Sequence, residues 1–197
     1  MTPLNPAFPR LHIGCGRTIL QGWINLDAVA LPGVDVVANL NDCSSTPLPF
    51  ADSSFDEFAA SHVIEHIVHS LPLMQELHRI AKPHAKATFR VPYGSSDDAF
   101  EDPTHVRQYF LHSFEYFAQP AYWRADYGYR GDWEVEGRIL RVSAQRYQGQ
   151  TTDHILQEVE RYRNVVQEMV IHLRAVKPIR EPRRELHVLA PIEIQFV

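Results

Sequence analysis

The feature that most constrains this chain is a short apolar segment ending in two glycines, Leu11-His-Ile-Gly-Cys-Gly16. It is partly β-branched and too short for a helix, so it predicts a buried strand that runs into a tight turn. Glycines in such a turn let the backbone approach a ligand where a Cβ atom would collide. Ligands of open parallel sheets lie at the carboxyl ends of the strands. The segment therefore predicts either a ligand-binding turn or simply a turn that ends a strand.

Further strands and one helix follow this segment. Strands are expected over residues 23–27, 34–38, 55–61 and 87–91. The helix between the last two has Ser70 at its N-cap and Pro72 in its first turn, and Pro83 ends it. This alternation favours a parallel sheet covered by helices on both faces. The connections after Gly16 and Asp27 have room for little more than one helical turn, so the first crossovers must be compressed.

The second half of the chain is less regular at first. Residues 94–135 are aromatic-rich, and a strand is expected over residues 135–142. A long helix is predicted over residues 153–176 from an apolar stripe at alternating spacings of three and four, made by Ile155, Val159, Tyr162, Val166, Met169 and Leu173. This helix could form a homo-oligomer interface or pack on the sheet, and both alternatives stay open. Residues 186–189 and 192–197 are expected to be closing strands.

Size, charge and cysteine content narrow the class of protein. A chain of 197 residues with 45% hydrophobic and 22% charged residues fits one domain over residues 1–197, with residues 1–10 as an N-terminal tail. The net charge of −5 disfavours nucleic acid as a partner, and the basic stretch 177–184 is best interpreted as a solvated loop. Two cysteines and the absence of a leader or a long apolar run predict a cytoplasmic protein with no membrane partner.

Asp27 ends the strand expected next to the glycine turn. A carboxylate there can accept hydrogen bonds from the hydroxyl groups of a ribose, or it can cap a surface turn. A dinucleotide cofactor is disfavoured on two counts. The fingerprint's third glycine is absent, and Asp27 follows Gly16 by 11 residues (27 − 16), where that fingerprint needs about 20.

Several segments, taken in order, resemble the class I SAM-dependent methyltransferases, most closely the small bacterial type 11 group. They are Leu11-His-Ile-Gly-Cys-Gly16, Gly22-Trp-Ile-Asn-Leu-Asp27, Leu48-Pro-Phe-Ala-Asp-Ser-Ser-Phe-Asp-Glu57, Ala60-Ser-His-Val-Ile-Glu-His66 and Glu76-Leu-His-Arg-Ile-Ala-Lys-Pro83. The resemblance covers residues 11–110. It implies a Rossmann-like α/β sheet, mostly parallel with an antiparallel closing strand, and a methyltransferase that uses S-adenosyl-L-methionine.

The resemblance also implies a set of cofactor contacts. The glycine turn would pack against the methionine part of the cofactor, Asp27 would hold the ribose, and Asn39 or Asp42 would lie near the adenine. The family often has aspartate where this chain has Asn39, and an amide can still bond to an adenine edge. The expected cofactor-binding residues are Gly14, Cys15, Gly16, Asp27, Asn39, Leu40 and Ser61.

Methyl transfer from a sulfonium is a direct displacement, so the protein must align the reactants and often remove a proton. Histidine suits proton removal near neutral pH. His62 is expected at the end of the strand 55–61. His105 is expected above the same sheet edge, oriented by Asp102, with Arg107 holding an anionic group. His62, Asp102 and His105 are thus the candidate catalytic residues, although a salt bridge that merely pins the loop would explain the last two equally well.

The segment His62-Val-Ile-Glu-His66 also fits a zinc-binding pattern. That pattern requires both histidines on one helix face. Because His62 is expected at a strand end, we predict no bound metal, and we expect His66 to be a packed, hydrogen-bonded core residue.

The sequence constrains the identity of the methyl acceptor less than that of the cofactor. Residues 94–135 are expected to cover the substrate, because no helices precede the first strand; their aromatic residues could form a lid or part of the core. The expected function is methyl transfer to oxygen or nitrogen of a small-molecule or sugar-containing acceptor. A glycan-linked acceptor is suggested because related proteins are often associated with surface-polysaccharide synthesis. The alternatives are a non-catalytic SAM-fold scaffold subunit and, less favoured, a dinucleotide-binding enzyme.

Overall fold

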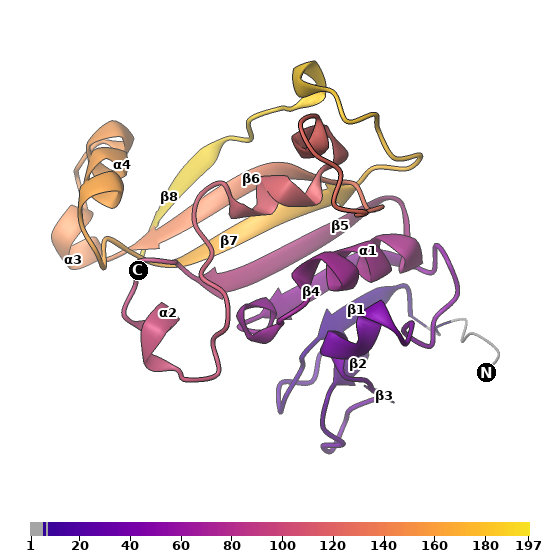
Figure 1. Ribbon diagram of the computed structural model, residues 1–197. Coiled ribbons are helices and arrows are strands. Elements are labelled where there is room, and N and C mark those ends of the chain that lie inside the picture. The colour runs from indigo at the N-terminus through magenta and orange to yellow at the C-terminus, as the bar shows by residue number, and fades with distance from the viewer. Residues whose placement is uncertain (1–5, 7) are drawn as a thin grey trace.

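One mixed sheet organises the computed structural model, which describes residue 6 and residues 8–197 (Figure 1). The strands are β1 (Arg10–Ile13), β2 (Ile24–Asp27), β3 (Val36–Val37), β4 (Phe55–Ser61), β5 (Ala81–Pro92), β6 (Trp133–Val142), β7 (Val166–Ala175) and β8 (Ile192–Phe196). Their order in the sheet is β3-β2-β1-β4-β5-β7-β6-β8. Strands β1 to β5 are parallel, β7 is antiparallel to β5 and β6, and β8 is parallel to β6. The expected Rossmann-like, mostly parallel sheet is confirmed.

The N-terminal tail predicted over residues 1–10 ends before Arg10. Residues 1–5 and 7 lie outside the described part of the chain, and Arg10 already belongs to β1.

Helices are short apart from two. The α-helices are α1 (Ser70–Ile80), α2 (Asp98–Glu101), α3 (Ala144–Tyr147) and α4 (Thr152–Arg161). The 3-10 helices are η1 (Leu40–Ser44), η2 (Ile64–His66), η3 (Ser113–Phe117), η4 (Gln119–Tyr122) and η5 (Arg184–Leu186). Helix α1 matches the predicted helix, with His69 rather than Ser70 at its N-cap position. Its apolar stripe is buried against the sheet, and α1 lies over the same face as residues 113–122 (Figure 1).

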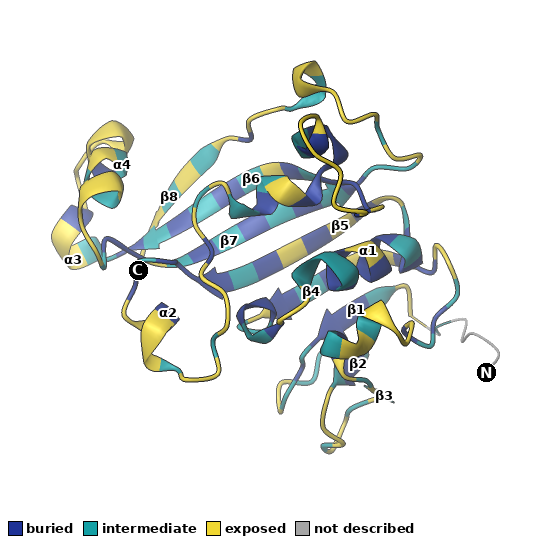
Figure 2. Ribbon diagram, in the orientation of Figure 1, coloured by how far each residue is buried: buried dark blue, intermediate teal, exposed yellow. Residues whose placement is uncertain are grey.

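Along β5 the opposite face of the sheet is exposed, which corrects the expectation of helices on both faces. Along β5, Ala87 and Phe89 are buried while Lys86 and Thr88 between them are exposed, and Figure 2 shows this alternation as stripes. The cause is the compressed first half, because the crossovers from β1 to β2 and from β2 to β3 contain no helix. Alternating polar side chains make this exposed face of β5 tolerable, since Lys86 and Thr88 are hydrophilic.

Asn25 in β2 holds the first crossover in place without a helix. Its side-chain oxygen accepts the Leu20 N–H at 2.9 Å, and its amide donates to the carbonyls of Leu20 at 3.1 Å and Trp23 at 3.2 Å. These bonds satisfy loop groups that a helix would otherwise pair within itself. One buried amide thus fixes the loop that follows the glycine turn.

The predicted long helix over residues 153–176 is wrong beyond Arg161. Helix α4 ends there, Asn164 turns the chain with φ +58°, and the following residues form β7. Met169, Ile171 and Leu173 are buried at every second position, which is strand periodicity. The antiparallel strand is therefore this internal one, inserted between β5 and β6.

The C-terminal segment is partly as predicted. Strand β8 confirms the expectation for residues 192–197. Residues 186–189 do not form a strand, because η5 ends at Leu186 and the following residues pair with no neighbour in the described sheet.

Candidate active site

The two glycines after β1 have different physical roles. Both adopt left-handed backbone conformations, with φ +60° at Gly14 and +52° at Gly16. A Cβ atom at Gly14 would lie 2.4 Å from Cγ2 of Val63, whereas one at Gly16 would meet no atom within 4 Å. Gly14 therefore permits close packing against the loop after β4. The space beside Gly16 is open and can receive a ligand.

Asp27 is held against this turn by backbone donors. Its carboxylate accepts the Gly16 N–H at 2.7 Å and the Val29 N–H at 2.9 Å. These bonds join the turns after β1 and β2 and fix the orientation of the carboxylate. Each carboxylate oxygen has more than one lone pair, so acceptor capacity remains for a ligand hydroxyl. The predicted adjacency of Asp27 and the glycine turn is thus present.

The other expected cofactor residues lie along the same edge of the sheet but differ in how far their side chains are exposed. The Asn39 side chain caps η1 by accepting the Asn41 N–H at 3.1 Å. Leu40 is buried in the core, so its side chain stabilises the fold and only its backbone is near the edge. Cys15 is also buried; burial and then the charge of Asp27 raise the pKa of its thiol. Ser61 ends β4 and is exposed.

His62 follows β4 in a left-handed conformation with φ +54°. This backbone geometry brings its ring to Glu168 of β7, with Nε2 2.7 Å from Oε1. Arg90 and Arg141 also donate to Glu168. Burial would raise the pKa of Glu168, but the hydrogen bonds from Arg90 and His62 outweigh it and lower the pKa. The carboxylate thus stays charged and orients the imidazole.

Sequence reasoning missed Glu168. It lies in the segment predicted to be helical, and a correct strand assignment would have placed it beside β5.

Asp102 does not orient His105 as predicted. His105 Nε2 and Asp102 Oδ2 are 3.8 Å apart, which is too long for a hydrogen bond. Asp102 instead accepts from the Thr104 N–H at 2.8 Å and the Thr104 hydroxyl at 2.6 Å, and these bonds lower its pKa. Arg107 donates to the Val68 carbonyl at 2.6 Å, which pins the loop. The local reason is an Asx turn, in which aspartate bonds to its own chain two residues on.

Glu65 is a site residue that sequence analysis did not select. Its side chain is 1% exposed, and it lies between the rings of His62 and His105. Burial raises the pKa of Glu65, and the neighbouring histidines act in the opposite direction. His66, expected to be a core residue, is only half-buried, and its Nδ1 lies 2.9 Å from the Thr104 hydroxyl. The expectation that it is hydrogen-bonded is confirmed.

A cavity of about 500 Å³ lies beside this loop. The segment 94–135 supplies most of its lining, which includes Val106, Arg107, Tyr109, Tyr116, Phe117, Tyr122 and Tyr127. Of the aromatic residues of this segment, Trp133 and Tyr129 are buried in the core, which was one of the two expected alternatives, and Trp123 and Tyr127 are exposed.

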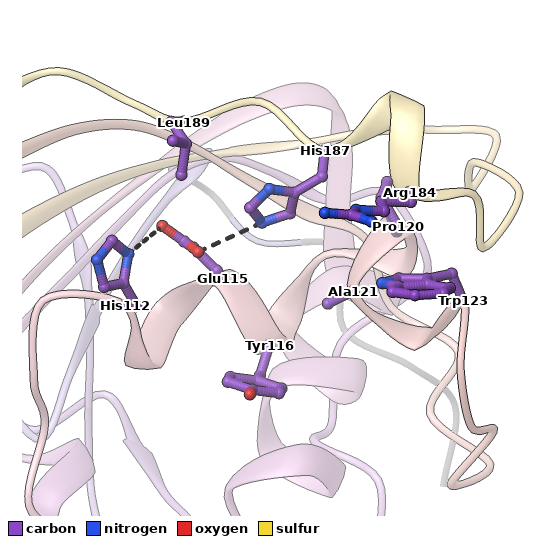
Figure 3. Close-up of a pocket in the computed structure, with 9 residues that line it drawn as sticks. All are labelled: His112, Glu115, Tyr116, Pro120, Ala121, Trp123, Arg184, His187 and Leu189. Carbon is purple, nitrogen blue, oxygen red and sulfur yellow. Dashed lines mark hydrogen bonds and ion pairs between the residues drawn. The ribbon is translucent and has the colours of Figure 1, made fainter.

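A second cavity, of about 440 Å³, is shown in Figure 3. Glu115 lies between His112, at 2.8 Å, and His187, at 3.3 Å. The buried Arg138 of β6 also pairs with Glu115 and donates to the Ala190 carbonyl at 2.8 Å. A buried arginine requires such a counter-charge. The cluster therefore joins η3 to β6 and to the segment before β8, which is a structural role.

Comparisons with known proteins agree with this geometry. Residues 11–89 match the family model described as methyltransferase domain. The fold is similar to a SAM-dependent methyltransferase from Archaeoglobus fulgidus, at 16% identity and a TM-score of 0.55, covering 86% of this chain and 87% of that chain. A SAM-dependent methyltransferase from Thermotoga maritima gives 13% identity, a TM-score of 0.53 and coverages of 87% and 83%. The fold is also similar to the [4+2]-cyclase SpnF, at 14% identity and a TM-score of 0.53, covering 89% of this chain and 78% of that chain. No curated protein sequence matches the chain.

The strand order and the glycine turn with its neighbouring aspartate give this chain the fold of the SAM-dependent methyltransferases to which it is similar, proteins whose cofactor is S-adenosyl-L-methionine. The match to the methyltransferase-domain model covers residues 11–89, which is less than half of the chain. Among the described residues, the helices lack the length and apolar character needed to cross a bilayer.

Proposed function

We propose that this chain transfers the methyl group of S-adenosyl-L-methionine to an oxygen or nitrogen of a small-molecule or sugar-containing acceptor. One observation supports it above others: the Asp27 carboxylate is fixed at the glycine turn, beside the open space at Gly16. A ribose in that space can donate its hydroxyls to Asp27, and the methionine part can follow the turn toward β4. The cofactor would then be bordered by Gly14, Cys15, Asn39, Leu40 and Ser61. Cys15 and Leu40 are buried, so they would contact it through their backbones.

The reaction requires alignment and removal of one proton. The acceptor atom forms a bond to the methyl carbon as the carbon–sulfur bond breaks, and the electron pair stays on sulfur. The acceptor's proton must pass to a base. We assign this role to His62, since its Nε2–H can donate to Glu168, which leaves Nδ1, 3.5 Å from Glu65 Oε1, as the acceptor. His105, whose side chain is 5% exposed, would position this site through Glu65, and Asp102 through Thr104 and His66.

The acceptor would bind in the cavity of about 500 Å³ lined by the 94–135 segment. Five of its eleven lining residues are aromatic, and Arg107 also lines it, which suits a ring-bearing acceptor such as a sugar. Both cysteines are free, which fits the reducing cytoplasm in which we place the protein.

Calorimetric titration of the purified protein with S-adenosylhomocysteine, with NAD in parallel, tests the proposal. Binding of S-adenosylhomocysteine alone supports it and would justify a screen of hydroxyl and amine acceptors. Binding of NAD instead, or of neither ligand, contradicts it.

A catalytically silent scaffold is the alternative from another class. Fold alone does not fix the reaction, and the similar fold of a [4+2]-cyclase illustrates this. A scaffold would bind cofactor weakly or not at all and would give no methyl transfer with any acceptor, so the same titration followed by the acceptor screen separates the two.

A further inference from the structure

Glu65 is a buried carboxylate near the active site, with His62 Nδ1 3.5 Å from its Oε1 atom. Its side chain is 1% exposed, and neither carboxylate oxygen has a hydrogen-bond partner among the described residues. A buried polar group without a partner costs about 1–3 kcal/mol, and an ionised one costs more. A buried polar group without a partner calls for an explanation, and a bound ion is one of the recognised ones.

Imidazole rings surround this carboxylate. His105 Nε2 lies 4.0 Å from Glu65 Oε1, and the His105 ring contacts the His66 ring with 4.7 Å between their centroids. The Nδ1 atom of His105 is buried and also lacks a partner within the described chain. One ligand atom from each of Glu65, His66 and His105 lies within 4.8 Å of the other two.

The neighbouring hydrogen bonds fix the tautomer of His66. The Thr104 hydroxyl donates to Asp102 Oδ1 at 2.6 Å, so its oxygen is left to accept from His66 Nδ1–H at 2.9 Å. His66 Nε2 then carries a free lone pair. A histidine that donates its other ring N–H to an oriented acceptor is the usual arrangement around a bound metal.

The two loops that bring these residues together are joined by their backbones. The Glu65 carbonyl accepts the N–H of Val106 at 2.9 Å and of Arg107 at 3.2 Å. The Tyr109 hydroxyl donates to the Ile64 carbonyl at 3.3 Å. The three side chains are therefore presented by a pre-formed scaffold, as a specific binding site requires.

We propose that Glu65, His66 and His105 bind a divalent transition-metal cation, for which zinc is the best match. Two imidazoles and one carboxylate with an open fourth position form a known type of catalytic zinc site. The His-x-x-Glu-His pattern thus contributes its last two residues, while His62 at the strand end pairs with Glu168. Zinc ligands about 2.0–2.1 Å from the ion are about 3.4 Å apart in a tetrahedron, so the side chains must move inward by about 1 Å.

The role of the cation rests on the proposed function. Glu65 lies two residues after Val63, whose side chain packs against the cofactor turn at Gly14. A cation there would bind an acceptor hydroxyl and lower its pKa. The hydroxyl proton would pass to His62, the oxygen would bond to the methyl carbon, and neutral S-adenosylhomocysteine would leave. The preferred acceptor is then an alcohol or phenol rather than an amine.

Metal binding can be measured without any turnover. The purified chain would be stripped with a chelator and titrated with Zn²⁺ against a chromogenic competitor, and metal content would be measured by mass spectrometry. We expect one equivalent in the wild type, and affinity reduced by more than about 100-fold in Glu65→Gln and His105→Ala, since loss of an outer-shell partner already costs about 10–100-fold. Thermal unfolding checks that each variant folds. Glu65→Gln removes an unpaired buried charge with little change in shape, so it should fold even if His105→Ala does not.

The matched control is His69→Ala, an exposed histidine three positions after His66 and outside the cluster. Its zinc affinity should equal that of the wild type. No stoichiometric binding in the wild type, or equal affinity in Glu65→Gln and His69→Ala, would overturn the proposal. Titration of the same samples with S-adenosylhomocysteine keeps the two questions apart: loss of cofactor binding with zinc retained contradicts the proposed function alone, and the reverse contradicts the metal site alone.

Discussion

Replacing Asp27 with alanine is the sharpest test of the cofactor site. In the free protein, the carboxylate accepts N–H groups from Gly16 and Val29. In the complex, it would also accept from the ribose hydroxyls, and hydrogen bonds to a charged group contribute about 1.5–3 kcal/mol each. A factor of ten in the dissociation constant is about 1.4 kcal/mol, so the loss of even one such bond weakens binding about tenfold or more.

The structural cost of this change should be small. The two backbone N–H groups lie at an accessible edge and can bond to water in the variant, so we expect a loss of about 1 kcal/mol of unfolding free energy. Calorimetry with S-adenosylhomocysteine gives the affinity, and thermal unfolding checks the fold. Asp56→Ala is the matched control, because Asp56 is an exposed aspartate of β4 whose carboxylate pairs only with Lys82. An unchanged dissociation constant in a folded Asp27→Ala protein would refute the ribose assignment.

Four further substitutions probe the neighbouring groups. His105→Ala should lower turnover more than cofactor affinity, and turnover equal to the wild type would remove His105 from the mechanism. Gly14→Ala should cost about 2–6 kcal/mol in denaturant unfolding, from its left-handed backbone and its collision with Val63. Gly16→Ala should cost only about 1–3 kcal/mol but weaken S-adenosylhomocysteine binding, and equal effects at both glycines would contradict their separate roles. The pKa of Glu168 is lowered from 4.5 in the folded state, so its ion pairs stabilise the protein above that pH and are lost as pH falls through the folded pKa. Glu168→Gln should flatten this acidic part of the stability curve, and an identical pH dependence would count against the assignment.

The first half of the fold follows from local signals. Strand β4 matches its predicted bounds because a turn precedes it and its end is marked by the change to the His62 loop. Gly14, Gly16 and Asp27 could be placed together because parallel strands end at one sheet edge. The absence of helices after β1 and β2 follows from the short connections, but the uncovered face does not follow from any single segment, since it depends on what every crossover leaves unpacked.

The structure of the second half of the chain could not be predicted from local signals. The apolar residues Val166, Met169 and Leu173 fit a helical stripe as well as a strand, and only pairing with β5 and β6 selects the strand. The His62–Glu168 pair depended on that assignment. The Glu65 cluster could not be predicted from the sequence. A carboxylate becomes a candidate ligand when it is buried without a partner, and burial depends on the assembled fold.

The exposed face of β5 is a surface where substitutions should change the stability of the protein little. Lys86 and Thr88 point away from the core, and a change at either one leaves the strand's backbone ladder and the buried Ala87 and Phe89 untouched. The glycine turn and its ligand space lie at the strand ends rather than on this surface. A cysteine introduced at Thr88 could therefore carry a fluorophore or a surface tether, reporting on cofactor binding from a position where neither folding nor the active site is disturbed.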